Sequence, residues 1–142
     1  MSVAEEIVAY FVAQGIGTDA DVDGMVDGAI FRDFMPETPN TCGAVITYGG
    51  APPVNGLGVD GIQFESPGVQ VRFRGEPHEN DLPKAKTQLA YVALGKIQAE
   101  SLSGTPYVMI RPVRAPEIFK RDESNRVTWM VNAICEKELS AP

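Results

Sequence analysis

The sequence predicts an α+β domain in which two main helices pack on a mostly antiparallel β-sheet. Apolar residues recur at helical spacing within 3–14 and 81–97, whereas residues 69–74 and 127–135 show the alternation typical of strands. Glycines and prolines punctuate the chain between these segments. The predicted order is therefore one helix, three strands, a second helix and three further strands, and we expect residues 1–142 to form a single domain.

The first helix is predicted from its capping pattern and its apolar face. Ser2 and Glu5 have the spacing of a capping box. Ile7 and Phe11 follow four residues apart, as the buried face of an amphipathic helix requires. We therefore expect a helix over residues 3–14.

The next segments are predicted to be a loop and two strands. Residues 17–28 are rich in Asp and Gly and are predicted to be a loop. Residues 29–35 and 42–48 are apolar runs separated by a turn with two prolines, and each is predicted to be a strand. Residues 49–61 hold five glycines and two prolines, so irregular structure is expected there.

The third strand and the second helix follow. The alternation over residues 69–74 predicts one buried face, with Arg72 and Arg74 on the outward face. Asp81 is expected to cap the second helix, with Pro83 in its first turn. The apolar residues expected to line the buried side of this helical segment are Leu89, Ala90, Ala93, Leu94 and Ile97.

Three strands are predicted in the C-terminal third of the chain. Residues 107–110 form a short apolar run, and residues 118–119 and 127–135 flank a turn at 122–125. Neither face of the last strand is strongly polar, so this strand is expected to be central or covered on both sides. Trp129 is interpreted as a core residue.

Composition limits the possible functions. The net charge of −7 argues against tight binding to nucleic acid, because such affinity comes from Lys and Arg at phosphates. The N-terminus carries acids where a signal peptide has basic residues, and no apolar run reaches the length of a membrane span. Cys42 and Cys135 are expected to be free, buried thiols. We therefore expect a soluble intracellular protein with no membrane contact.

Two local patterns resemble ligand-binding motifs but lack their structural context. Residues 56–61 fit G-x-G-x-x-G, yet residues 62–67 are too short and Pro-bounded to supply the required helix. Residues 19–27 place aspartates at EF-hand positions 1, 3, 5 and 9 and Gly24 at position 6, but position 12 is Ile30. No cofactor and no metal site is predicted; a solvated acidic loop is favoured over weak cation binding.

Catalytic groups are scarce in the sequence. The single histidine, His78, precedes Glu79 in a predicted loop, and no nucleophile motif accompanies the pair. We predict no catalytic residue and no enzymatic activity; a small enzyme that uses Glu79 and His78 is the alternative.

A set of short motifs in order resembles a known family. These motifs lie at residues 34–40, 48–50, 69–74, 121–123 and 129–132, with Leu94 and Ile97 of the second helix, residues 102–104 and Arg126 between them. Together they resemble phage minor capsid or tail-completion proteins, and these are similar to the tail terminators of long-tailed phages. The acidic loop and the segment 51–61 have no counterpart in this pattern.

The resemblance implies a structural role in the virion neck, with assembly in the host cytoplasm. Tail terminators have an α+β fold and form a homo-hexameric ring at the head-proximal end of the tail tube. The expected partners are the chain itself, the tail tube protein and the head connector or stopper protein, with genomic DNA passing through the ring without specific binding. The alternatives are another neck ring protein (head-completion or stopper) and a small cytoplasmic binding module.

The candidate interaction residues come from the loops and the outward strand face. They are Gly49, Gly50, Pro52, Pro53, Arg72, Arg74, Asp122 and Glu123. We expect the arginines to pair with acidic side chains of a neighbouring chain. We also expect the loop 49–61 or the hairpin 122–125 to contact the tail tube or connector, so that deletion of either would abolish joining and leave folding intact.

Overall fold

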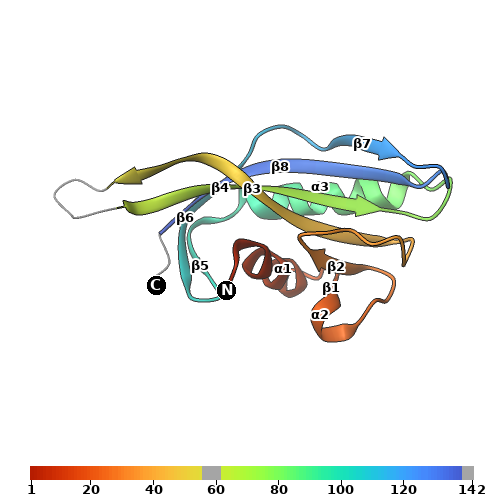
Figure 1. Ribbon diagram of the computed structural model, residues 1–142, viewed down its shortest axis with the longest axis horizontal. Coiled ribbons are helices and arrows are strands. Elements are labelled where there is room, and N and C mark those ends of the chain that lie inside the picture. Colours follow the sequence, from red (N-terminus) through yellow and green to blue (C-terminus); the bar gives the residue numbers. More distant parts are fainter. Residues whose placement is uncertain (56–61, 139–142) are drawn as a thin grey trace.

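The computed structural model describes residues 1–55 and 62–138, in which three helices pack against an eight-stranded sheet (Figure 1). The helices are α1 (Val3–Ala13), α2 (Ala20–Asp23) and α3 (Asp81–Gly95). The strands are β1 (Thr18–Asp19), β2 (Ala29–Arg32), β3 (Cys42–Asn55), β4 (Ile62–Arg74), β5 (Gln98–Leu102), β6 (Thr105–Pro112), β7 (Glu117–Arg121) and β8 (Val127–Glu138). The predicted α+β class is confirmed.

The sheet is antiparallel except at one end. Its order is β1-β2-β3-β4-β8-β6-β5, and the pairs β1–β2 and β2–β3 are parallel. β4 pairs along almost the whole length of β8, so β6 and β7 share the opposite edge of that strand. The prediction that the last strand is central is therefore confirmed.

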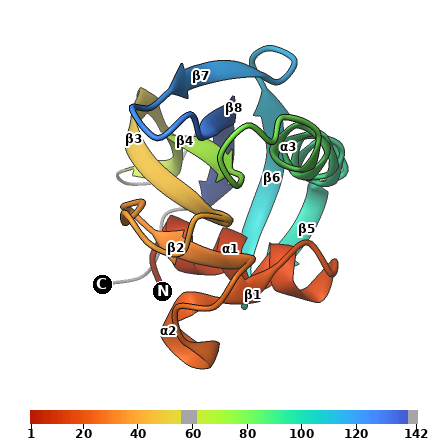
Figure 2. The same cartoon turned by 90° about the vertical axis from the view of Figure 1, so that its right-hand side faces the viewer.

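The sheet curls around α1 and α3, which both lie on its concave face (Figure 2). One core joins the two helices to the inner side chains of β3, β4, β6 and β8, and it includes Phe11, Val45, Val71, Leu94 and Val131. The outer residues of β4 and β8 alternate with these and face away from the helices. The convex face is therefore where polar side chains of the central strands gather.

The two main helices match the predictions with small differences. The Ser2 hydroxyl accepts the Glu5 backbone N–H at 3.1 Å, so the predicted cap of α1 is confirmed. The predicted cap of α3 is wrong by one residue, because Asn80 holds that position and its side chain accepts the Trp129 indole N–H at 2.9 Å. Leu89, expected on the buried face of α3, is 54% exposed.

Three elements differ from the sequence expectations. The predicted loop 17–28 contains β1 and α2, and β5 was not predicted. β3 continues to Asn55 where irregular structure was expected, because pairing with β4 tolerates its glycines and prolines through register shifts. Residues 56–61, which hold the G-x-G-x-x-G pattern, lie outside the described residues.

The two cysteines are both free and buried, as predicted. Burial raises the pKa of the Cys135 thiol to about 12, and burial also raises the pKa of Cys42. Because the thiolate is the reactive form, both side chains are expected to be inert in the folded protein.

Candidate assembly site on the outer face

A cleft of about 250 Å³ lies on the convex face of the sheet. Its walls are β7 and residues 33–37, the segment that leaves β2. Its floor is formed by outward side chains of β3, β4 and β8. We call it the outer cleft, and its side chains include Phe34, Met35, Ile46, Arg72, Phe119 and Lys120.

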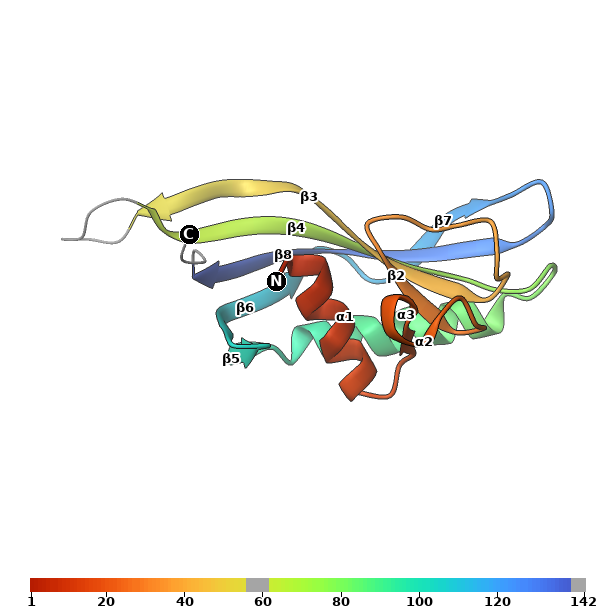
Figure 3. The same ribbon diagram turned by 60° about the horizontal axis from the view of Figure 1, so that its bottom comes forward.

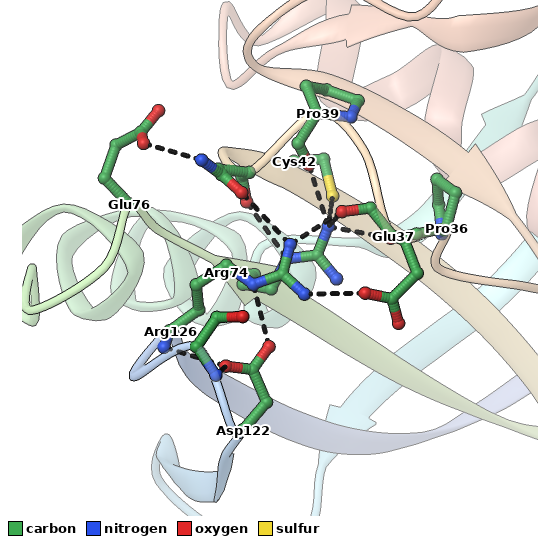
Figure 4. A network of polar contacts seen from close by, with 10 residues as sticks. Pro36, Glu37, Pro39, Cys42, Arg74, Glu76, Asp122 and Arg126 are labelled. Carbon is green, nitrogen blue, oxygen red and sulfur yellow. Dashed lines mark hydrogen bonds and ion pairs between the residues drawn. The ribbon is translucent and has the colours of Figure 1, made fainter.

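Arg74 is buried beside this cleft and holds the turn between β2 and β3 (Figure 4). Its guanidinium donates to the backbone oxygens of Pro36 at 2.7 Å, Pro39 at 2.8 Å and Asn40 at 3.0 Å. Only 6% of Arg74 is exposed. Arg74 lies on the predicted outward face, but the turn folds over that face and uses its donors, so they are not available to pair with a neighbouring chain.

Arg126 holds the same turn from the start of β8. It donates to the Glu37 backbone oxygen at 2.6 Å and to the Asn40 side-chain oxygen at 3.1 Å. It also pairs with the Glu37 carboxylate at 3.0 Å and with Asp122 at 2.7 Å. Arg74 and Arg126, here called the arginine latch, thus fix residues 36–40 to the ends of β4 and β8.

Asp122 closes the hairpin between β7 and β8. One carboxylate oxygen accepts the backbone N–H groups of Ser124 at 3.0 Å and Arg126 at 2.9 Å. Burial works to raise the pKa of Asp122, but these hydrogen bonds and the charge of Arg126 outweigh it and lower the pKa. The carboxylate therefore stabilises the fold in its ionised form.

We expect Asp122→Asn to destabilise the protein at pH 7 by about 1 kcal/mol, because charge-assisted hydrogen bonds are lost. A carboxyl with a lowered folded-state pKa stabilises above its ordinary pKa, and this stabilisation disappears as pH falls through the folded-state value. Urea unfolding of wild type and variant should therefore differ at pH 7, and the difference should shrink as the pH falls below 3.8, the ordinary pKa of this carboxyl. Glu123→Gln, at the exposed neighbouring position, is the control and should change neither curve. A gap that stays constant with pH would contradict this account.

Arg72 differs from the latch arginines because it donates to no backbone oxygen among the described contacts. Its guanidinium carbon lies 4.1 Å from the centre of the Phe119 ring, and its Nε donates to Gln70. Burial lowers the pKa of Arg72, but a guanidinium stays charged in proteins. No carboxylate of the described residues pairs with it. Arg72 is thus a half-buried cation in the outer cleft without an anion.

Gly50 shapes the long extension of β3. Its φ is +70°, and a Cβ atom there would lie 2.1 Å from the Ser66 backbone oxygen. It lies at the register shift between Tyr48 and Ala51, whereas Gly49 beside it has no atom within 4 Å of a built Cβ. Gly50 therefore allows β3 to bulge and stay paired with β4.

Beyond this bulge, β3 and β4 extend past the helices as a long arm (Figure 3). We call residues 49–55 and 62–68 the β3–β4 arm. Pro52 and Pro53 lie within its β3 strand. The predicted interaction residues therefore lie in four different places. Arg72 lines the outer cleft, Arg74 and Asp122 belong to the contacts of the arginine latch, and Glu123 lies at the exposed tip of the 122–125 hairpin. The other four are in the arm: Gly49, Gly50, Pro52 and Pro53.

The acidic loop is organised by an ion pair. The Asp19 carboxylate caps α2 by accepting the Asp21 backbone N–H at 3.0 Å and also pairs with Arg32. Arg32 contacts the Asp21 carboxylate at 3.2 Å as well. Two of the EF-hand-like positions are therefore engaged by Arg32. In the described part of the chain, no group of three or more His, Cys, Asp and Glu is arranged to hold a metal ion.

The structure also describes His78, the residue named for the enzyme alternative, and the helices that could be compared with a membrane span. His78 is exposed in a turn, and its backbone N–H donates to the Asn125 oxygen at 2.9 Å. Among residues 1–55 and 62–138, no helix has the length and apolar character needed to cross a membrane.

Both the fold and the sequence match known proteins. A chain in the solved virion of a native gene transfer agent particle superposes with a TM-score of 0.62, covering 97% of this chain and 96% of that one at 14% identity. The sequence also matches the family described as bacteriophage tail terminator protein over residues 13–139, and the chain belongs to this family. No curated protein matches the sequence. The resemblance stated above is thus confirmed: this is a structural protein of the phage tail, from a structural rather than an enzymatic family.

Proposed function

We propose that the protein is the terminator ring of its phage: a homo-hexamer at the head-proximal end of the tail tube that ends tube polymerisation and joins the tail to the head connector. Membership of the tail terminator family over residues 13–139 carries this proposal. A closed ring needs two different surfaces on each subunit, one for each neighbour. The outer cleft, which holds the half-buried Arg72, and the acidic segment that contains α2 are two chemically different surfaces of this kind.

The charge of the protein suits a ring through which DNA passes. Each chain carries a net charge of −7, so six chains surround the axis with a strongly acidic assembly. Affinity for DNA requires Lys and Arg at phosphates, so an assembly of this net charge is expected to repel the duplex rather than hold it.

The surfaces proposed to meet the tube and connector are the β3–β4 arm and the exposed tip of the 122–125 hairpin. Deleting either segment is a poor test, contrary to the expectation from sequence. Residues 49–55 pair with β4, and Asp122 anchors Arg126, so both deletions would disturb folding. A charge reversal at the tip, Glu123→Arg, leaves these internal contacts in place and tests the contact alone.

The experiment that tests the proposal is light scattering of the purified protein, alone and with tail tube protein, combined with electron microscopy of the tubes. A terminator gives a particle of about six times the 15.3 kDa chain mass, alone or on tube ends, and capped tubes stop growing. A stopper or other neck ring would leave tube growth unchanged while binding the connector. A monomer indifferent to tubes would contradict the proposal and favour a small binding module.

A further inference from the structure

The segment that contains α2 presents apolar side chains to solvent within an acidic surface. Val22, Met25 and Val26 are 75%, 59% and 49% exposed. Asp23 and Asp27 lie among them, also exposed and without an ion pair in the described residues. Soluble proteins rarely expose clustered apolar side chains without a binding role. We call residues 20–27 the α2 knob.

The knob is held in a defined position. Asp19 and Asp21 both contact Arg32 at the end of β2, and the Gly28 backbone N–H donates to the Thr41 oxygen at 2.9 Å. A surface fixed in this way loses little conformational entropy when it binds.

The outer cleft has the complementary chemistry. Phe34 and Phe119 are 57% and 38% exposed at its two walls. Arg72 stacks on the Phe119 ring and forms no ion pair among the described residues, and the exposed Lys120 also lines the cleft. The carboxylates that line the cleft have partners within the chain: Glu37 and Asp122 pair with Arg126, and Asp33 accepts from Thr47. A ligand segment that combines apolar side chains with carboxylates would cover the rings and neutralise Arg72.

We propose that the α2 knob of one copy docks in the outer cleft of the next copy, with Val22 and Met25 against Phe34 and Phe119 and with the Asp23 carboxylate on Arg72. This inference rests on the proposed ring and names the contact that builds it. The knob and β7, one wall of the cleft, lie on opposite sides of the molecule in the view of Figure 2. One copy can therefore engage a neighbour at each surface, in the head-to-tail manner that generates rings.

Charge explains why this pairing is favoured over other contacts between copies. Two chains that each carry −7 repel at long range, and repulsion at most surface patches opposes association. The outer cleft offers Arg72 and Lys120 to an acidic segment. The knob supplies that acidic segment, so the contact offsets the general repulsion locally.

Disulfide trapping tests the contact. The chain is prepared as Val22→Cys, as Phe119→Cys and as the double variant, with Val22→Cys/Leu89→Cys as the control because Leu89 is exposed on α3. The native thiols are buried and their pKa values are raised, so they do not compete. Under mild oxidation with tail tube protein present, we expect a ladder of covalent oligomers from the Val22→Cys/Phe119→Cys chain only. The oligomer mass is measured on the same samples.

Charge exchange gives a second, independent readout. In the double-cysteine chain, Arg72→Glu should reduce the ladder by about tenfold, and Asp23→Arg added to it should restore the ladder. Circular dichroism confirms that each variant is folded.

The outcomes separate this contact from the ring itself. A ring of normal mass without a ladder, or with an equal ladder from the Leu89 control, overturns the knob–cleft contact and leaves the terminator role standing. A protein that forms no oligomer with or without tubes overturns both. An Arg72→Glu protein that keeps its ladder overturns the pairing of Asp23 with Arg72, and if it also no longer binds tubes, Arg72 contacts the tube protein instead.

Discussion

Arg74→Met is expected to lower the free energy of unfolding by about 3 kcal/mol, a large fraction of the stability of a domain of this size. The methionine fills much of the space but donates no hydrogen bond. The carbonyl oxygens of Pro36, Pro39 and Asn40 then lose a charged donor in a buried place. Urea denaturation followed by circular dichroism measures the loss.

Arg72→Met is the matched control, because it makes the same change two residues earlier on the same face of β4. Arg72 donates to one side chain, Gln70, and to no backbone oxygen among the described contacts. We expect it to cost about 1 kcal/mol or less, mainly through lost packing on Phe119. Equal losses for the two variants would show that the latch adds nothing beyond an ordinary surface arginine, and would contradict its assigned role.

The same pair of arginines shows what the sequence could and could not predict. Alternation over residues 69–74 correctly placed both side chains on the face opposite the core. It could not reveal that residues 36–40 fold over one of them, because that contact joins segments more than thirty positions apart. Local periodicity reports the face of a strand, whereas coverage of that face depends on tertiary structure.

The missed strands have related physical reasons. β5 lies at the edge of the sheet and all but its last residue are exposed, so its sequence carries no apolar alternation. The extension of β3 reads as a loop from its glycines and prolines, yet β4 provides a continuous partner that overrides local propensity. Central β8, apolar on both faces, was predicted correctly because its burial is visible in its own residues.

The candidate site was predicted in part. Asp122 and Gly50 were selected as contact residues, and the structure gives both of them internal roles. Arg126 and Phe119 were missed, although the spacing of Asp122 and Arg126 across a predicted turn was a usable signal for the first. Nothing local marks Phe119 as the partner of Arg72. The structural role itself was predicted from the ordered motifs, which the family match supports.

Gly50→Ala is expected to lower the free energy of unfolding by about 2–3 kcal/mol, or to open the β3–β4 arm while the core stays folded. A φ of +70° disfavours any L side chain by about 1 kcal/mol, and the overlap with the Ser66 oxygen forces the two strands apart. Hydrogen exchange of the β3 and β4 backbone amides, beside urea unfolding, distinguishes the two results.

Gly49→Ala is the control, because the adjacent position has an ordinary φ and no atom near a built Cβ. It should match wild type in stability, exchange and assembly. If Gly50→Ala frees the arm amides, keeps the core protected and leaves tubes uncapped, then the paired arm is needed for assembly independently of folding. If both glycine variants behave alike, the bulge imposes no constraint and the arm tolerates rearrangement. If the arm opens and tubes are still capped, the contacts that end the tube lie elsewhere, with the exposed tip of the 122–125 hairpin as the remaining proposed surface.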